Sequence, residues 1–354
     1  MFRRTLTTAC CGTLALAIAG CSSTGDDKPA ATSSGKVTTV KLVTHESFVI
    51  PKDVQAEFTK TTGYQLQVLA SGDAGKLANS VVLAKGNPTG DVVFGIDNTF
   101  ASRVVDSGAL AANEPKALPK SASKYALPGE AAQSLAPIDF GDVCVNVDDA
   151  WFAAKKKAKP QSLDDLTKPE YKDLFVTPGA ATSSPGMAFL LATVAKYGDD
   201  GWQDYWKKLK ANGVKVTSGW SDAWGVDYTA GGGKGTRPIV LSYNTSPADT
   251  IKDGKPTTSA MTDSCFRQVE YAGVLKGAKN EPGAKAFIDF MLGKKFQASM
   301  PKNMYVFPVD DQVKLPDAWQ TAVKVPDKPL HVDPTKITKN RDDWLRRWQD
   351  AVSG

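Results

Sequence analysis

The sequence predicts an α/β protein with doubly wound mixed sheets joined by crossing strands, and three observations point to this fold class. From residue 38 to about residue 104, strand-like apolar stretches alternate with stretches of helical periodicity. Two extended apolar stretches, Ala136–Val147 and Cys265–Leu275, are suited to cross from one part of the fold to another. An apolar strand at Pro238–Ser242 runs into the polar turn Tyr243–Pro247, as at the carboxyl ends of strands in open sheets.

The chain begins with the pattern of a bacterial lipoprotein signal. Arg3 and Arg4 precede an apolar stretch that is too short to span a bilayer, and small residues then stand directly before Cys21. We therefore expect residues 1–21 to form the signal, Cys21 to carry lipid, and residues 22–37 to form a flexible tether. The alternative is an ordinary secretory signal with a chance cysteine.

Charge and length restrict the function classes. The formal net charge is +5, it falls to +3 without the two signal arginines, and no block of five Lys or Arg occurs. This distribution gives no electrostatic footprint for nucleic acid. The mature chain of about 330 residues is long enough for two domains, and no later stretch approaches the apolar length of a membrane span.

The cysteines and histidines predict a disulfide and no metal. Cys144 and Cys265 remain after the signal is removed and Cys21 is acylated. Disulfides persist outside the cytosol, so we expect these two to pair, and the alternative is two separate buried thiols. His45 and His331 are far apart, and no His/Cys cluster has zinc spacing. We expect neither a metal site nor a cofactor.

The first hundred residues of the mature chain are expected to alternate strand and helix. The predicted strands are Thr38–Val43, Tyr64–Leu69 and Val92–Ile96. Val54 and Phe58 mark the first intervening helix, and Leu77 and Val81 mark the second. The small-residue turn between the second strand and its helix can aim backbone N–H groups and the Asp73 carboxylate into a cleft.

The start of a helix near residue 185 is a candidate ligand contact. Ser183 and Ser184 supply capping hydroxyls, and Pro185 suits the first turn. Such an end favours an anionic or hydroxyl group, and a plain helix cap is the alternative. The glycine-rich loop Gly231–Thr236 is no phosphate loop, because Gly rather than Ser or Thr follows Lys234.

Tryptophans supply a candidate aromatic wall. Trp220 and Trp224 are spaced i,i+4 just before the strand that ends in Tyr243–Pro247. Aromatic planes beside hydrogen-bonding groups suit a flat, cationic, heteroaromatic ligand, and the alternative is that Trp220 belongs to the core. Trp202 and Trp206 share the same spacing, and we expect them to be core residues.

Several short motifs occur in the same order as in a known family. They are His45–Phe48, Asp91–Asn98, Pro137–Gly141, Ser183–Gly186, Gly219–Gly225, Val240–Pro247, Gln268–Glu270 and a Trp-rich final helix. With them the chain resembles the thiamine-binding proteins of bacterial ABC importers, in the type II periplasmic-binding-protein superfamily, over about residues 38–352. The collinear order makes the resemblance specific.

The resemblance implies a two-lobed protein that holds thiamine between its lobes. One lobe would contain residues 38–140 and 268–312, and the other residues 141–267 and 313–354. The protein would be a monomeric, extracytoplasmic receptor, anchored to the cell membrane through lipid on Cys21. It would deliver thiamine to an ABC permease and would not be an enzyme.

The resemblance also implies the ligand contacts. They are Asp73, Ala74, Ser183, Ser184, Trp220, Tyr243, Asn244, Thr245, Ser246 and Tyr305, and we add His45 and Trp224. His45 and Tyr305 stand where the family often has Tyr and Trp, which can weaken stacking or change the preference between thiamine and its phosphates. Chemically, Trp220 and Tyr305 would stack on the ligand, Asp73 would neutralise its cation or accept from its amine, and the hydroxyls would hold its hydroxyethyl or phosphate end.

Two alternatives remain open. One is a receptor of the same fold for ferric iron, a polyamine or another heterocycle. Ferric-binding relatives commonly use adjacent paired tyrosines, which this chain lacks. The other is a thiamine-cleaving enzyme of this fold with Cys144 as its nucleophile. A nucleophile needs a thiolate with a base beside it, and a disulfide to Cys265 would disarm it.

Overall fold

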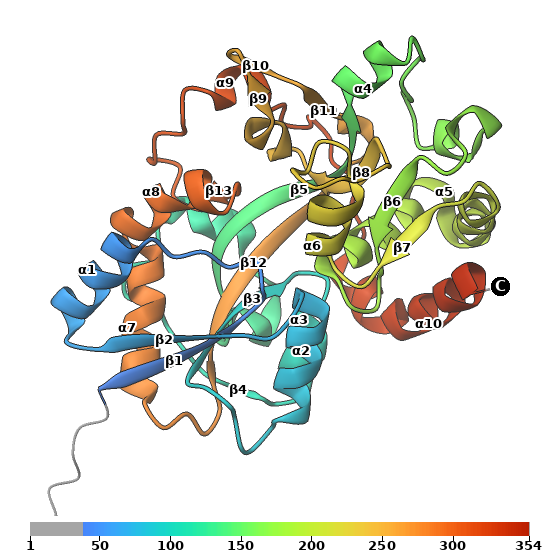
Figure 1. The fold of residues 1–354 in the computed structure, drawn as a ribbon. Helices are drawn as coiled ribbons and strands as arrows, with labels where there is room; N and C mark the ends of the chain where they lie inside the picture. The colour runs from blue at the N-terminus through green and yellow to red at the C-terminus, as the bar shows by residue number, and fades with distance from the viewer. Residues whose placement is uncertain (1–37, 354) are drawn as a thin grey trace, which may run out of the picture. The chain divides into compact units, whose positions relative to one another are not determined.

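The structure is a computed structural model that describes residues 38–353 (Figure 1). The predicted signal over residues 1–21, its lipidation site Cys21 and the tether over residues 22–37 lie outside the described residues. No helix in the described part of the chain is both long and apolar enough to cross a bilayer.

The described chain is built on one large mixed sheet. Its main path runs β2-β1-β3-β12-β5-β8-β6-β7, and β4, β11 and β13 pair at its sides. The strands on this path are β1 (Thr39–Thr44), β2 (Gln65–Ala70), β3 (Val92–Asp97), β5 (Ala136–Asp148), β6 (Phe175–Pro178), β7 (Lys215–Thr217), β8 (Ile239–Tyr243) and β12 (Phe266–Leu275). The side strands are β4 (Leu110–Ala111), β11 (Thr258–Ala260) and β13 (Phe307–Pro308), and β9 (Ile251–Lys252) pairs separately with β10 (Lys255–Pro256).

Two parallel groups of strands are joined by a central antiparallel pair. β1 is parallel to β2 and β3, and β6 is parallel to β7 and β8. Between these groups, β12 runs antiparallel to β3 and β5, and β5 runs antiparallel to β8 (Figure 1). This arrangement confirms the predicted mixed α/β fold with long crossing strands. The assignment of residues to two lobes stays a prediction.

Helices follow the strands of each parallel group. The α-helices are α1 (Lys52–Thr62), α2 (Ala74–Leu83), α3 (Ala101–Asp106), α4 (Asp149–Ala154), α5 (Ser184–Ala211), α6 (Trp220–Asp222), α7 (Glu281–Leu292), α8 (Lys294–Asn303), α9 (Trp319–Ala322) and α10 (Pro334–Ser353). α5 is interrupted at Gly198, whose φ of 70° and ψ of 177° are not helical. Shorter turns are η1 (Lys120–Tyr125), η2 (Gly129–Gln133), η3 (Asp164–Thr167), η4 (Pro169–Tyr171), η5 (Ala223–Asp227), η6 (Ser246–Asp249) and η7 (Thr262–Ser264).

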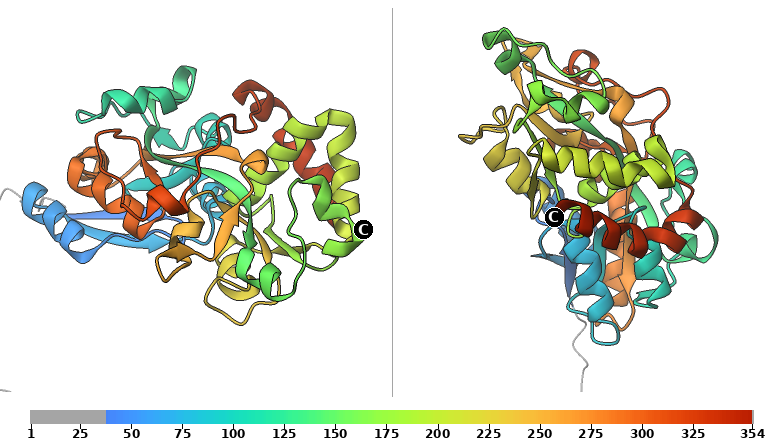
Figure 2. Two further views of the ribbon diagram at one scale, coloured as in Figure 1. Left: turned by 90° about the horizontal axis from the view of Figure 1, so that it is seen from above. Right: turned by 90° about the vertical axis from the view of Figure 1, so that its right-hand side faces the viewer.

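Side chains that alternate along the strands build two main cores. In β1, Val43 joins the cluster that contains α2, whereas Leu42 joins the cluster that contains α1 and α7. The first cluster also holds Trp202 and Trp206, both fully buried, which confirms that they are core residues. Trp206 meets Trp348 of α10 with ring centroids 5.6 Å apart, and α10 lies along α5 (Figure 2).

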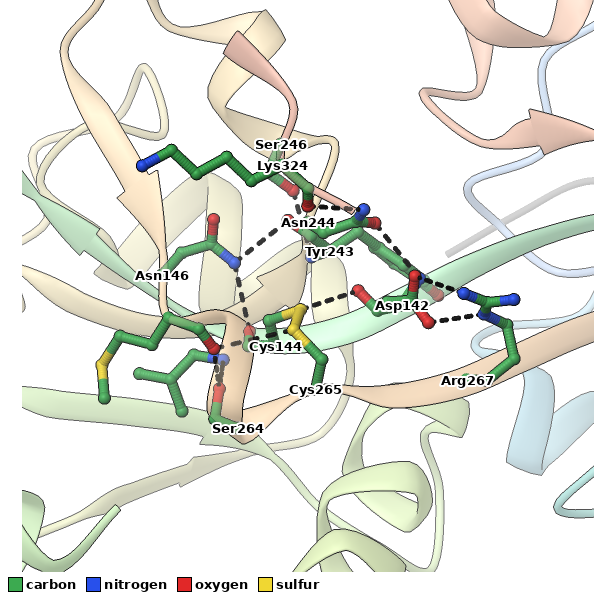
Figure 3. The surroundings of a disulfide bond; sticks show 12 residues. Asp142, Cys144, Asn146, Tyr243, Asn244, Ser246, Ser264, Cys265, Arg267 and Lys324 are labelled. Carbon is green, nitrogen blue, oxygen red and sulfur yellow. Dashed lines mark hydrogen bonds and ion pairs between the residues drawn. A yellow bond between two sulfur atoms is a disulfide. The ribbon is translucent and has the colours of Figure 1, made fainter. Parts of the chain in front are cut away.

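A disulfide holds the central strand pair. It joins Cys144 in β5 to Cys265, just before β12 (Figure 3). Next to it, Arg267 donates to both carboxylate oxygens of Asp142, over 2.5 and 3.0 Å. These cross-links bind β5 to β12 where the two strands run antiparallel.

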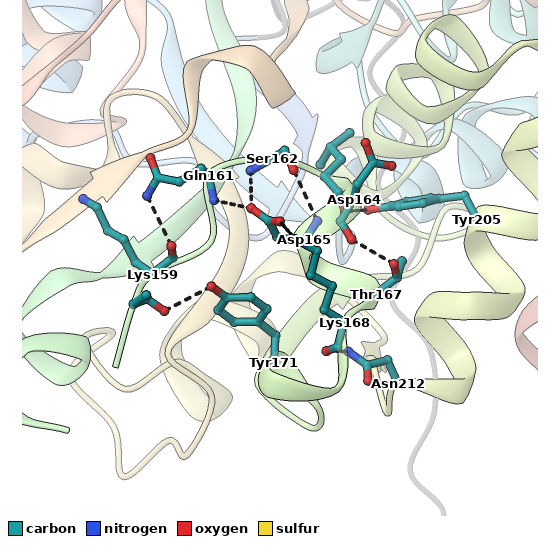
Figure 4. Close-up of polar contacts among 12 residues, drawn as sticks. Lys159, Gln161, Ser162, Asp164, Asp165, Thr167, Lys168, Tyr171, Tyr205 and Asn212 are labelled. Atoms are coloured by element: carbon teal, nitrogen blue, oxygen red, sulfur yellow. Dashed lines mark hydrogen bonds and ion pairs between the residues drawn. The ribbon is translucent and has the colours of Figure 1, made fainter. Parts of the chain in front are cut away.

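Hydrogen bonds join the segment over residues 163–168 to α5 and to Asn212, the residue that follows α5 (Figure 4). Tyr205 donates to the Leu163 carbonyl over 2.9 Å, and Asn212 donates to the Leu166 and Lys168 carbonyls over 2.8 Å each. The chain after Ser162 forms the short 3₁₀ turn η3 rather than a longer helix, because Pro169 follows within two turns. The polar groups of this region form hydrogen bonds with one another, and none of these residues lines the cavity between the two parallel groups of strands.

Candidate functional site

Both parallel groups of strands contribute residues to one cavity of about 320 Å³. Its lining residues are His45, Ser47, Val49, Asp73, Ala74, Ser184, Pro185, Trp220, Ser221, Trp224, Tyr243, Ser246, Asp249, Gln268, Glu270, Asn303, Met304, Tyr305 and Val306. This volume is at the small end of the range for ligand pockets, about 300–1,000 Å³. The cavity therefore suits a small organic molecule.

Most of the predicted contacts meet at this cavity. Nine line it, namely His45, Asp73, Ala74, Ser184, Trp220, Trp224, Tyr243, Ser246 and Tyr305. The other three, Ser183, Asn244 and Thr245, are fully buried and are not among its lining residues. Asn244 instead donates to the Lys324 carbonyl over 3.1 Å, and Thr245 donates to the Tyr305 carbonyl over 2.5 Å. These two side chains position the polar turn.

Trp220 and Trp224 stack on each other, and both line the cavity as an aromatic wall. The two rings stack with centroids 5.8 Å apart and an interplanar angle of 13°. The Trp220 indole N–H donates to the Ser242 hydroxyl over 2.9 Å, which fixes the orientation of the ring. The turn that carries Trp224, Ala223–Asp227, is a π-helical turn, a feature that is frequent at functional sites.

Tyr305 enters the same cavity from the segment that follows α8. Its backbone has φ 54°, in the left-handed region that bulky residues rarely adopt. Burial and a hydrogen bond to the Asp249 carboxylate raise the pKa of Tyr305 to about 12. The side chain is therefore a neutral phenol at physiological pH. Trp220 and Tyr305, from distant parts of the chain, thus border a common space.

Asp73 connects three helix N-termini. Its Oδ1 accepts from the backbone N–H groups of Ala74 (2.6 Å) and Ser184 (3.3 Å), and its Oδ2 accepts from that of Trp220 (2.8 Å). These groups begin α2, α5 and α6, where the helix dipole favours a carboxylate. The carboxylate is thus engaged by the protein itself, and it holds elements that follow β2, β6 and β7 against one another.

Two serine hydroxyls at the start of α5 have no hydrogen-bond partner among the described residues. They belong to Ser183 and Ser184, which are 0% and 1% exposed. A buried hydroxyl without a partner costs free energy. Only Ser184 lines the cavity, so its hydroxyl is the one that a ligand can reach.

A row of carboxylates behind the cavity was missed by the sequence analysis. Glu270 in β12 stands directly opposite Asp97 in β3 and Asp139 in β5. Residues directly opposite one another project from the same face of a sheet, so the three acids are neighbours. Glu270 lines the cavity, and its Oε1 lies 3.4 Å from Nε2 of His45. The motif Gln268–Glu270 was noted in the sequence, but only strand register shows its neighbours.

Burial and mutual repulsion perturb the pKa values of this row. Burial, with smaller contributions from the Glu270 charge, raises the pKa of Asp97 to about 7 and raises that of Asp139. Burial lowers the pKa of His45, but Glu270, together with Asp73 and Glu46, outweighs it and leaves the pKa raised. The raised pKa of His45 favours its protonated form beside Glu270.

Two glycines make room for the rings at this face. A Cβ on Gly95, which has φ 98°, would lie 2.3 Å from Cδ2 of His45. One on Gly141 would lie 2.9 Å from Cδ1 of Tyr243. The rings of His45 and Tyr243 therefore pack directly against glycine backbone. The Tyr243 hydroxyl also donates to the Gln268 side chain over 3.3 Å.

Comparison with known proteins places the chain in a family. Residues 87–328 match the family described as "Bacterial extracellular solute-binding protein". The chain belongs to this family. The solute-binding protein is 32% identical to the "Thiamine-binding periplasmic protein" of Brucella melitensis, over 92% of this chain and 94% of that protein.

Solved structures agree with this placement. The solute-binding protein resembles a structure titled "Periplasmic thiamin binding protein" with a TM-score of 0.77 and 28% identity, over 89% of this chain and 96% of that one. In sequence, the likeness to the "Fe(3+)-binding periplasmic protein" of Serratia marcescens is weaker than that to the thiamine-binding protein of Brucella melitensis, at 26% identity over 73% of this chain and 74% of that protein. Within the described residues, no three His, Cys, Asp or Glu side chains are arranged to hold a metal ion.

Proposed function

We propose that this solute-binding protein captures thiamine in the cavity and delivers it to the permease of an ABC importer. The observation that carries the proposal is the meeting of Trp220, Tyr305 and the Glu270 carboxylate at one small cavity. Aromatic faces and a negative charge suit a flat cation such as the thiazolium and aminopyrimidine rings of thiamine. The names of the similar proteins, which specify thiamine, support the same ligand.

In this proposal each wall of the cavity recognises a different part of thiamine. Trp220 and Tyr305 stack on the rings, and each desolvated face contributes about 1–2 kcal/mol. Glu270 supplies the negative charge, whereas Asp73 positions Trp220 and Ser184 through their backbone N–H groups. The unpartnered hydroxyl of Ser184 is available to the hydroxyethyl arm.

The proposal includes an extracytoplasmic monomer held at the membrane by lipid on Cys21. The support is the lipobox pattern in the sequence, which a Cys21→Ser variant tests. We expect that variant to be recovered from the medium or periplasmic fraction, whereas the parent protein stays with membranes. A parent protein whose mass contains no lipid would contradict the anchor.

An enzyme is the less favoured candidate. Cys144 is bonded to Cys265, is fully buried and is not among the lining residues of the cavity. A nucleophile needs a free thiolate within reach of the substrate. Alkylation of the non-reduced protein tests this directly, because a labelled Cys144 would favour the enzyme.

The main test is a thiamine titration of Trp220→Ala by calorimetry. We expect a loss of more than about tenfold in affinity, since one stacking face is removed. Trp151→Ala, which removes a partly buried tryptophan outside the cavity, should leave the dissociation constant unchanged. An equal effect of the two substitutions would exclude Trp220 from the site, and native mass spectrometry of the purified protein would show whether thiamine is retained.

A further inference from the structure

We propose that Thr245 is a positioning residue, which fixes the Tyr305 ring at the cavity without touching the ligand. The inference rests on the proposed function, because it concerns one of the two aromatic faces that would stack on thiamine. Thr245 is fully buried and is not among the lining residues of the cavity, whereas Tyr305 lines it. The side chain of Thr245 therefore acts on the ligand through its neighbours.

A single hydrogen bond joins the two residues. The hydroxyl of Thr245 donates to the Tyr305 carbonyl over 2.5 Å. Thr245 stands between β8 and η6, whereas Tyr305 follows α8. α8 packs in the core cluster that contains α1 and α7, and β8 belongs to the parallel group of β6. The bond thus ties together two parts of the molecule that both border the cavity.

The backbone of Tyr305 needs such a restraint. Its φ of 54° lies in a region that costs free energy for a bulky residue and persists only where neighbouring groups hold it. On one side, the sulfur of Met304 accepts from the Val49 N–H over 3.1 Å, and on the other, Val306 is buried in the core. The direction of the Cα–Cβ bond follows from this backbone geometry, so a restraint on the carbonyl is also a restraint on the ring.

The Tyr305 ring has fewer restraints of its own than the Trp220 ring. Trp220 stacks on Trp224, and its indole N–H donates to Ser242. Tyr305 makes no ring contact of this kind with any residue that the structure describes. Its hydroxyl meets the Asp249 carboxylate, which belongs to the turn that begins at Thr245. One turn therefore holds Tyr305 at both its backbone and its hydroxyl.

The turn itself is firmly held. The hydroxyls of Ser242 and Ser246 lie 2.7 Å apart, and Ser246 also accepts from the Tyr243 N–H over 3.1 Å. The Ala248 N–H donates to the Thr245 carbonyl over 3.0 Å. The Thr245 hydroxyl is thus carried on a fixed support, and it can orient the more weakly restrained Tyr305.

The test is a thiamine titration of Thr245→Val by calorimetry. Valine has nearly the shape of threonine but no hydroxyl, so the bond to Tyr305 is lost, and we expect about fivefold weaker binding. Thr245→Ser keeps the hydroxyl and should bind within about twofold of the parent protein. Thr250→Val removes a buried hydroxyl just after the same turn, outside the cavity lining, and should leave the dissociation constant unchanged. Equal losses in Thr245→Val and Thr245→Ser would overturn the inference.

A second background shows whether the effect passes through Tyr305. In Tyr305→Ala the ring is absent, so adding Thr245→Val should weaken binding by less than about twofold. A loss of about fivefold in that background as well would show that Thr245 acts independently of Tyr305. That result would overturn the inference and leave thiamine capture standing, whereas no thiamine binding by the parent protein would overturn both. If Thr245→Val does not fold, Thr245→Ala, which also lacks the hydroxyl, carries the same comparison.

Discussion

β5 and β12 carry buried acids on both of their faces, and the two faces treat them differently. On one face, Asp142 is fully buried and receives two hydrogen bonds from Arg267 (Figure 3). The guanidinium of Arg267 also lies over the Phe140 ring, 5.0 Å from its centroid. On the other face, Asp139 is fully buried opposite Glu270, and neither of its oxygens has a hydrogen-bond partner among the described groups. The same pair of strands thus holds one acid that is paired with a guanidinium and one that has only another carboxyl group opposite it.

The difference between Asp142 and Asp139 distinguishes a face that stabilises the fold from a face that can bind a ligand. A buried carboxylate that forms two hydrogen bonds with a guanidinium has its charge balanced and needs no further partner. Carboxylates stacked on one another either retain protons or attract a cation. Only the second face borders the cavity, through Gln268 and Glu270, so the acids without a guanidinium partner lie beside the space that a cationic ligand can enter.

The largest expected effect comes from the disulfide beside the acid that is paired with a guanidinium. It closes a loop of 121 residues, and a loop of that length predicts a loss of about 4–5 kcal/mol when the link is removed. Cys144→Ala with Cys265→Ala should show this loss in denaturant unfolding, and reduction of the parent protein should reproduce it. A loss below about 1 kcal/mol would mean that the strand pair does not depend on the link.

Removal of Arg267 should have the next largest effect. Arg267→Met leaves Asp142 buried without its counter-charge, and we expect about 3 kcal/mol of destabilisation by denaturant unfolding. The matched double variant Arg267→Met with Asp142→Asn should recover part of this loss, because it removes the stranded charge. No recovery in the double variant would indicate that Arg267 acts through packing on Phe140 instead.

The face whose acids lack a guanidinium partner predicts a pH dependence. Asp97 has a folded pKa of about 7, well above its ordinary value, and the pKa of His45 is raised as well. Between these folded and unfolded pKa values the folded protein binds more protons, so this contribution to stability is present at low pH and is lost as pH rises through about 7. We expect the protein to be more stable at pH 5.5 than at pH 8.

Asp97→Asn isolates the contribution of that carboxyl. The amide oxygen can still accept from Thr99 and Phe100, while the charge that titrates is gone. The slope of unfolding free energy against pH should fall by up to about 1.4 kcal/mol per pH unit near neutrality. Asp106→Asn, an exposed acid at the end of α3, is the control, and an equal change in both slopes would contradict the assignment.

The smallest expected effect is on ligand affinity. Glu270→Gln keeps the shape of the side chain and removes the charge that faces the cavity, so thiamine should bind roughly fivefold more weakly. Calorimetry checks this statement, and an unchanged affinity would remove Glu270 from cation recognition.

Local patterns in the sequence predicted the parts of the site that one segment supplies. The i,i+4 spacing of Trp220 and Trp224 and the polar turn after β8 mark the aromatic wall and its neighbours. The contact of Asp73 with the ligand cation stays a prediction, and the structure adds that its oxygens accept from backbone N–H groups of α2, α5 and α6. The partners in α5 and α6 lie more than a hundred residues away along the chain, and no local pattern encodes them.

The sequence alone determined the alternation of strands and helices, the crossing strands and the family resemblance, because each depends on periodicity or on motif order along the chain. Only the tertiary structure decided that Asp97, Asp139 and Glu270 form one row and that Arg267 belongs to the opposite face. The physical reason is strand register: a shift by one residue between β5 and β12 would exchange the faces. Register is set by packing of the whole sheet, and it determines which buried charge meets a ligand.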